Sequence, residues 1–219
     1  MTRLLPELYE ARFDEHEVSA KDEVWREIVR FLQQYVDRDA PLLDIACDRG
    51  HFVRWADAAE RWATDIRDVA ALLPPQVRFV QADGLDLASI VPTDHFGTVF
   101  MSNYLEHLAS SDAVIDQLRV ARELLRPGGR VIILQPNIRL VGSRYWDFID
   151  HRVALTERSL LEAAELAGLR TVDLITRFLP YSTKGRLPSD ARLVRAYLAF
   201  RPAWLLMGRQ TLYVGERAR

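Results

Sequence analysis

Three short acidic motifs in the first half of the chain follow apolar runs, and these residues are the best placed to do chemistry. The first is the segment 43–50, which reads Leu-Asp-Ile-Ala-Cys-Asp-Arg-Gly. The others are Asp65 and the pair Asp83-Gly84. An apolar strand that turns tightly into a helix, with a carboxylate at the tip of the next strand, is how an open α/β sheet builds a nucleotide pocket. The motifs therefore predict such a pocket.

Strands and helices must alternate along the chain to position these motifs. The expected strands cover 42–46, 61–65, 77–82, 97–102, 130–135, 170–178 and 210–215. The expected helices cover 20–36 behind Ser19, 50–59, the residues after Ser110, 156–167 behind Thr156, and 187–200. This alternation predicts an α/β, Rossmann-like, mostly parallel sheet with helices on both faces. Because one modest helix joins the last two strands, we expect an antiparallel edge strand.

Composition limits the functional classes. The 219 residues suit a single domain, and the formal net charge of −2 gives no general attraction to DNA or other nucleic acid. The single cysteine, Cys47, excludes an internal disulfide and a multi-cysteine zinc site. The lone cysteine also leads us to expect a cytoplasmic protein. Because no apolar run reaches 18 residues, we expect no stable membrane insertion.

Five segments in order resemble the motifs of class I S-adenosylmethionine-dependent methyltransferases. They are 43–50, 63–66, 80–84, 102–108 and 124–129. The resemblance implies a seven-stranded sheet with the last strand antiparallel. It also implies S-adenosylmethionine as cofactor and S-adenosylhomocysteine as product. We expect residues 1–37 to form an N-terminal helical lid, and 136–155 and 179–208 to be insertions on the acceptor side.

The resemblance also assigns cofactor contacts. Asp65 is expected to accept hydrogen bonds from both ribose hydroxyls, and Asp83 from the adenine amino group, with Gly84 leaving room for the ring. A helix cap at Asp65 and an Asx-turn at Asp83 are the alternatives. Asp44 is expected to order the turn. The full expected set is Asp44, Ala46, Cys47, Asp48, Gly50, Asp65, Ile66, Asp83, Gly84 and Asn103.

The chain departs from the family at Ala46 and Asp48, where the family usually has glycine. Aspartate is among the better non-glycine residues where φ is positive. Its carboxylate is expected to pair with the ammonium group of the cofactor or with Arg49. The alternative is that Asp48 weakens binding and the protein is a non-catalytic S-adenosylmethionine-binding protein.

The candidate catalytic residues are His107, His151 and Glu106. A hydroxyl acceptor needs a base, and histidine titrates near neutral pH. The same three residues, with Asn103, form a less favoured alternative: a metal site for an O-methyltransferase of RNA or catechol type. It is less favoured because Asn103 stands where such family members have glutamate.

The favoured function is methyl transfer to a hydroxyl of a small or medium acceptor: a sugar, a glycolipid precursor or a natural product. Tyr9 and Phe13 at the N-terminus, and the aromatic segment 144–148, are expected near the acceptor. The aromatic segment could equally be loop packing. The apolar residues of 178–181 and 197–204 are open to three uses: an acceptor wall, a homodimer contact, or a weak membrane-facing patch.

Overall fold

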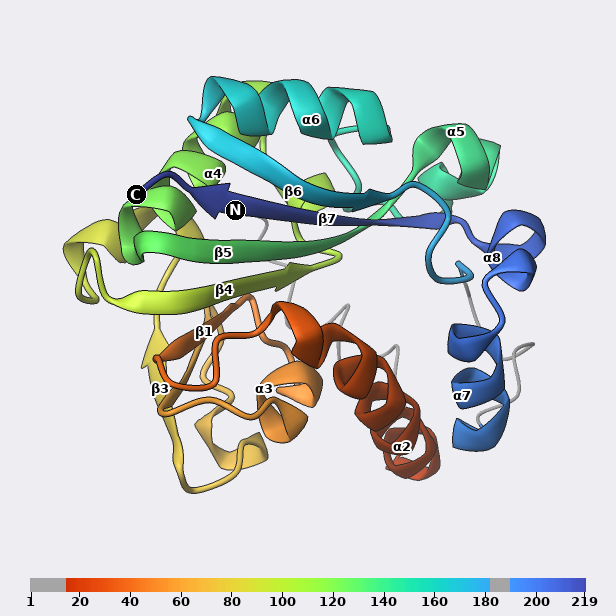
Figure 1. Ribbon diagram of the computed structural model, residues 1–219, viewed down its shortest axis with the longest axis horizontal. Coiled ribbons are helices and arrows are strands. Elements are labelled where there is room, and N and C mark those ends of the chain that lie inside the picture. The colour runs from red at the N-terminus through yellow and green to blue at the C-terminus, as the bar shows by residue number, and fades with distance from the viewer. Residues whose placement is uncertain (1–14, 182–189) are drawn as a thin grey trace.

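The computed structural model describes residues 15–181 and 190–219, with side chains from residue 21 onward, and this part of the chain is built on one sheet. Its strands are β1 Leu42–Ile45, β2 Arg61–Asp65, β3 Val77–Gln81, β4 Phe96–Ser102, β5 Leu125–Pro136, β6 Leu169–Ile175 and β7 Gln210–Arg217. They lie in the order β3-β2-β1-β4-β5-β7-β6 (Figure 1). β7 is antiparallel to both of its neighbours, and the other neighbouring pairs of the sheet are parallel. The predicted fold class is confirmed.

One detail of the sheet differs from the sequence prediction. The antiparallel strand is not at the edge but one place in from it, because β7 inserts between β5 and β6. Its residues Leu212, Tyr213 and Val214 are fully buried. A strand buried on both faces is typical of the interior of a sheet, and β6, with exposed residues at its start, takes the edge.

Helices cover both faces of the sheet (Figure 1). They are α2 Glu15–Leu32, α3 His51–Trp55, α4 Ser111–Leu124, α5 Ile138–Val141, α6 Glu157–Leu166, α7 Ala191–Ala199 and α8 Pro202–Met207. Short 3₁₀ turns, labelled η in chain order, are η1 Gln33–Tyr35, η2 Ala70–Leu72, η3 Gly84–Ser89, η4 Leu105–His107 and η5 Gly142–Asp147. The predicted caps Ser110 and Thr156 are confirmed, since each side chain accepts a hydrogen bond from the third residue after it.

Two predicted helices have different bounds. α2 begins at Glu15, so Ser19 lies inside it rather than capping it. The helix expected over 50–59 ends at Trp55. Beyond it, the Gln33 side chain donates to the Asp57 carbonyl and accepts from the Asp57 amide, at 2.8 and 3.0 Å. These bonds use backbone groups that a longer helix would need, so α3 stays short.

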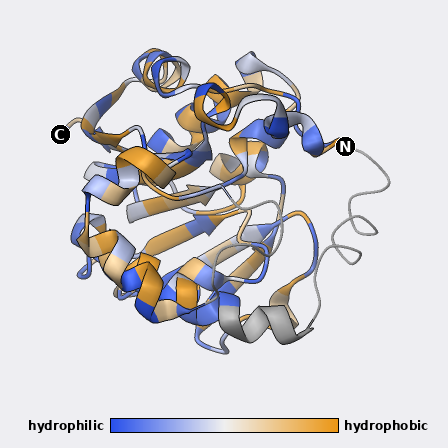
Figure 2. Cartoon of the chain, turned by 90° about the vertical axis from the view of Figure 1, so that its right-hand side faces the viewer, coloured by the Kyte–Doolittle hydropathy of each residue, from blue (hydrophilic) through white to orange (hydrophobic). Residues whose placement is uncertain are grey.

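The core has two layers, one on each side of the sheet. Along each central strand the side chains alternate between them. Leu43 and Ile133 pack with the residues of α4 and α6, whereas Leu42 and Ile132 pack with those of α2, α3, α7 and α8. Figure 2 shows the hydrophobic colour concentrated on the strands in the middle of the molecule. Burial on both faces is what a mostly parallel sheet requires.

The N-terminal helix α2 belongs to the core layer that contains Leu42 and Ile132. Ile28, Val29 and Leu32 are buried there. The Glu27 carboxylate, 4% exposed, receives two hydrogen bonds from Arg195 of α7, at 2.9 and 2.7 Å, and one from Arg30. This part of residues 1–37 therefore covers the sheet, and its role as a lid stays a prediction.

Two other expectations end at the limits of the described chain. Tyr9 and Phe13, expected near the acceptor, lie outside the described residues. The proposed insertions 136–155 and 179–208 contain α5 with η5 and α7 with α8 respectively. In the described ranges, no helix is long and apolar enough to cross a membrane.

Leu118 of α4 is fully buried in the core layer that contains Leu43 and Ile133, so its substitution tests the packing of that layer. We expect Leu118→Ala to lower the free energy of unfolding by about 2–5 kcal/mol, through lost burial and the cavity left behind. The neighbouring Arg119→Ala, on the exposed side of α4, should change it by less than about 0.5 kcal/mol. Urea denaturation measures both. Equal losses would contradict this packing.

Candidate functional site

The turn between β1 and α3 is held by buried polar groups. The Asp44 side chain is 3% exposed and accepts a hydrogen bond from the Val53 amide at 3.3 Å. The Cys47 amide donates to the Thr64 carbonyl at 2.9 Å, which ties the turn to β2. Burial raises the pKa of Asp44 and that of the Cys47 thiol well above their ordinary values. Asp44 therefore orders the turn, as the sequence predicted, and the thiol stays protonated.

Three alternate residues of this turn have left-handed backbone. The φ angles are 56° at Ala46, 51° at Asp48 and 69° at Gly50. At Gly50 a Cβ atom would lie 2.2 Å from Cδ2 of Leu73, so a side chain there would be strained by the angle and would have to displace the end of Leu73. Ala46 and Asp48 adopt the glycine conformation at some steric cost, and aspartate tolerates it better than most residues.

Asp65, at the end of β2, is fully engaged within the chain. Its Oδ1 accepts from the Arg67 amide and from Arg67 Nε, each at 3.0 Å. Its Oδ2 accepts from the Asp48 amide at 3.1 Å and from Arg67 Nη2 at 3.0 Å. Arg67 Nη2 also donates to Oδ1 of Asp48 at 2.9 Å. Asp48 thus pairs with Arg67, a residue that the sequence analysis missed.

The signal for Arg67 was present but weak. It stands two residues after the acidic tip of β2, where its guanidinium can fold back on that carboxylate. Burial disfavours its charge, but the bonds to Asp65 and Asp48 outweigh that and raise the pKa of Arg67. The guanidinium is therefore charged at any physiological pH, and it is part of the site.

Asp83 and Gly84 follow β3 and have structural roles of their own. Asp83 accepts a hydrogen bond from the Leu85 amide at 3.1 Å, which is the Asx-turn alternative. A Cβ at Gly84 would lie 2.4 Å from the Tyr104 hydroxyl, which itself donates to Gln117 at 2.8 Å. Gly84 is therefore required by packing. Contact of either residue with adenine stays a prediction.

The remaining predicted cofactor residues lie at the same end of the sheet. The Ile66 carbonyl accepts from the Gln81 side chain at 3.0 Å. Asn103 follows β4 with a φ of 47°, and its amide donates to the Leu134 carbonyl at 2.9 Å. Its exposed side chain reaches Ser102 Oγ at 3.3 Å. Because β3, β2, β1 and β4 are neighbours and parallel, their carboxyl ends bring these residues together.

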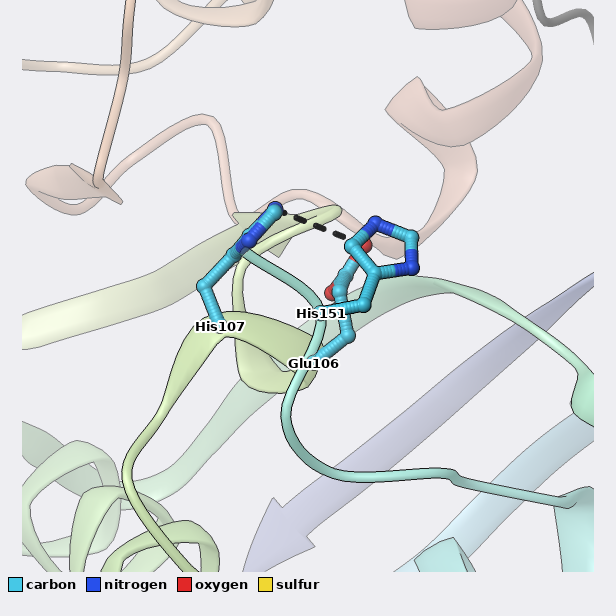
Figure 3. Close-up of side chains that lie close together, drawn as sticks. All are labelled: Glu106, His107 and His151. Carbon is cyan, nitrogen blue, oxygen red and sulfur yellow. Dashed lines mark ion pairs between the residues drawn. The ribbon is translucent and has the colours of Figure 1, made fainter. Parts of the chain in front are cut away.

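A second cluster consists of Glu106, His107 and His151 (Figure 3). Glu106 and His107 belong to η4, which follows β4, and His151 lies in the loop between η5 and α6. One ligand-type atom from each lies within 4.8 Å of the others. Glu106 Oε1 is 3.9 Å from His107 Nε2, and His107 Nδ1 is 3.2 Å from the Asp150 carbonyl oxygen. Burial raises the pKa of the Glu106 carboxyl, although His107 opposes the rise. The structure thus brings together all three predicted catalytic residues.

Buried polar atoms around Glu106 lack hydrogen-bond partners among the described residues. They are Oε2 of Glu106, Oε1 of Gln135 and the hydroxyl of Tyr181. The Gln135 side chain lies close enough to the Glu106 carboxyl to oppose the rise of its pKa. The charge of Glu106 in turn contributes to raising the pKa of the Tyr181 hydroxyl. Buried polar atoms are normally paired, so such a group of unpaired ones indicates a place that a water, an ion or a polar ligand would fill. The sequence analysis missed Gln135 and Tyr181.

The aromatic loop forms a wall behind His151. The Tyr145 ring lies 4.8 Å and the Phe148 ring 5.1 Å from that of His151, measured between centroids. Tyr145 is fully buried, and its hydroxyl donates to the Val153 carbonyl at 2.6 Å. Loop packing, the second reading of segment 144–148, therefore holds for Tyr145. Trp146 is half exposed and remains available for an acceptor.

The sequence matches the methyltransferase domain family over residues 15–174, most of the chain. The chain belongs to this family. Its cofactor is S-adenosylmethionine, and the cofactor expectation from the motifs is confirmed. No curated protein matches the sequence.

Solved structures agree on the fold of this methyltransferase domain. A methyltransferase from Archaeoglobus fulgidus is 16% identical, with 93% of this chain and 100% of that chain covered and a TM-score of 0.67. A complex from Haloferax volcanii that contains the Trm112 methyltransferase activator matches at 17%, 94% and 95%, with a TM-score of 0.69. The N-methyltransferase NodS of Bradyrhizobium japonicum, bound to S-adenosylhomocysteine, is 12% identical, with 89% of this chain and 86% of that chain covered and a TM-score of 0.62.

Asp44 gives this methyltransferase domain a measurable pH dependence. Because its native pKa is raised, the carboxyl stabilises the fold fully below its ordinary pKa, and that stability is lost as the pH rises through the native pKa. Relative to Asp44→Asn, the wild type should therefore lose unfolding free energy as the pH rises above about 3.9, the ordinary pKa of aspartate. Urea titrations at several pH values measure this. Asp116→Asn on exposed α4 is the control, and a flat difference for Asp44→Asn would contradict the assignment.

Proposed function

We propose that this methyltransferase domain acts on a hydroxyl of a small or medium acceptor: a sugar, a glycolipid precursor or a natural product. The observation that carries the proposal is the group of unpaired buried polar atoms at Glu106, Gln135 and Tyr181. The carboxyl oxygen of Glu106 and the amide oxygen of Gln135 can accept hydrogen bonds, and the Tyr181 hydroxyl can donate or accept one. A substrate rich in hydroxyl groups would satisfy these atoms, whereas an apolar substrate would not.

The cofactor would lie over the ends of β1, β2 and β3. The residues there fit it, because the turn at 46–50 has a backbone that glycine motifs adopt and Asp65 lies at the adjacent strand end. Bound S-adenosylmethionine supplies an already activated methyl group. What remains for the protein is to align the acceptor, exclude water and remove a proton.

The proton acceptor in this proposal is His107. Its Nδ1 lies 3.2 Å from the Asp150 carbonyl oxygen, and a carbonyl can only accept. A proton on Nδ1 leaves the lone pair on Nε2, the nitrogen that faces Glu106. Once Nε2 takes the proton, the Glu106 carboxylate stabilises the imidazolium. The His151 ring, 4.9 Å away between centroids, completes the wall.

A specific observation supports a second candidate, metal-assisted O-methylation. The atoms of Glu106, His107 and His151 lie close enough to hold one cation, and a carboxylate with two imidazoles suits Mn²⁺ or Zn²⁺. Asn103 does not join this set, since its side chain is exposed and bonded to Ser102. We favour the metal-free base because Asn103 stands where metal-assisted family members have glutamate, and its side chain takes no part in the cluster.

His107→Gln tests the proposed base. Glutamine keeps a polar side chain but cannot accept a proton at neutral pH, so turnover should fall about 100-fold or more. Radiolabelled methyl transfer to a panel of methyl glycosides, phenols, amines and carbon acceptors measures turnover. S-adenosylhomocysteine affinity, measured by calorimetry, should stay within about twofold of wild type. Full activity in His107→Gln would contradict the assignment, as would transfer only to amines or carbon acceptors.

Chelation separates the two candidates. If His107 acts as a base, turnover should survive exhaustive treatment with a chelator followed by gel filtration. If a metal assists, turnover should vanish and return with added Mn²⁺ or Zn²⁺. Elemental analysis of the purified protein, with His151→Ala as the matched variant, shows whether the cluster retains an ion.

A further inference from the structure

The Asp65 carboxylate has no acceptor position left for a ligand. An ionised carboxylate accepts about four hydrogen bonds, two at each oxygen. In this chain Oδ1 accepts from the amide and Nε of Arg67, and Oδ2 accepts from the Asp48 amide and from Arg67 Nη2. Two of the four donors are backbone amides and two belong to the Arg67 guanidinium.

The two kinds of donor differ in what they can do. The backbone amides are fixed by the turns after β1 and β2, so they orient the carboxylate. The guanidinium is on a flexible side chain, and its two bonds fall one on each oxygen. If the guanidinium moved away, one acceptor position on Oδ1 and one on Oδ2 of Asp65 would become free. A ribose diol presents two neighbouring hydroxyl donors, which is what those two positions would accept.

We propose that Arg67 is a latch on the ribose position: the guanidinium holds Asp65 until both ribose hydroxyls replace it. This rests on the proposed role of Asp65 as the ribose-binding carboxylate. It makes Arg67 a specificity-determining residue. A ligand with a single hydroxyl replaces only one of the two bonds, so it competes poorly with the guanidinium.

Asp48 is the second part of the latch. Its Oδ1 holds Arg67 Nη2 at 2.9 Å, and its side chain is about a third exposed, so it can retain the guanidinium after Asp65 lets go. A released arginine without a carboxylate partner would be less stable in this partly buried place. This explains why a carboxylate stands at a position with a φ of 51°, where glycine would be unstrained. The trio of Asp48, Asp65 and Arg67 carries a net charge of −1.

The test compares a ligand that needs Asp65 with one that does not. S-adenosylhomocysteine and its 2′,3′-dideoxy analogue are titrated calorimetrically into the wild type, Arg67→Met and Arg119→Met. Methionine keeps the aliphatic bulk of Arg67 but makes no bond to Asp65. We expect Arg67→Met to bind S-adenosylhomocysteine about tenfold more tightly than wild type. Its affinity for the dideoxy analogue should be unchanged within about twofold. Arg119→Met, on exposed α4, removes the same charge and should change neither.

Asp48→Asn provides a second, independent measurement. In the wild-type background it should weaken S-adenosylhomocysteine binding, because the displaced guanidinium loses its second carboxylate. In the Arg67→Met background it should have no effect, so the two substitutions should be non-additive. If Asp48→Asn has the same effect in both backgrounds, Asp48 is not part of the latch.

The outcomes distinguish this inference from the proposed function. If Arg67→Met binds both ligands as wild type does, or binds S-adenosylhomocysteine more weakly, the latch is wrong while the cofactor site stands. If neither the wild type nor Arg67→Met binds S-adenosylhomocysteine, both proposals fail. Circular dichroism confirms that each variant is folded, and Arg67→Gln replaces Arg67→Met if that variant is not.

Discussion

The site depends on one backbone constraint: the chain must pass from β1 into α3 through alternate left-handed residues at 46, 48 and 50. This path brings the Asp48 amide to the Asp65 carboxylate and the Cys47 amide to β2. Gly50 adopts its part of this path without strain and leaves room for the end of the Leu73 side chain. Everything proposed for the nucleoside end of the cofactor follows from the orientation that this turn gives to Asp65.

The segment after β4 joins the two halves of the site. The Tyr104 hydroxyl packs on Gly84, and burial near Asp83 and Asp65, two of the residues predicted to contact the cofactor, raises its pKa. Two residues later, Glu106 faces the histidines, and its carbonyl accepts the amides of Arg152 and Val153 at 2.8 and 3.1 Å. The short turn η4 and the residue before it thus tie the loop around Arg152 and Val153 to the carboxyl ends of the strands.

Much of the fold could be predicted because it depends on local patterns. Apolar runs gave the strands, and Ser110 and Thr156 gave two helix starts. The position of β7 could not be predicted, since insertion between β5 and β6 is decided by long-range pairing. The length of α3 depends on Gln33, a residue 24 positions from Asp57. Arg67 was missed for a similar reason: its role appears only when the turns after β1 and β2 lie side by side.

The fork between Glu27 and Arg195 has a mechanical consequence. It joins α2, near the start of the chain, to α7, in the connection before the last strand. Separating the helices would cost Glu27 two of its three hydrogen bonds from arginine and leave only the one from Arg30 of its own helix. A movement of either helix must therefore break these two charged bonds or carry the other helix with it.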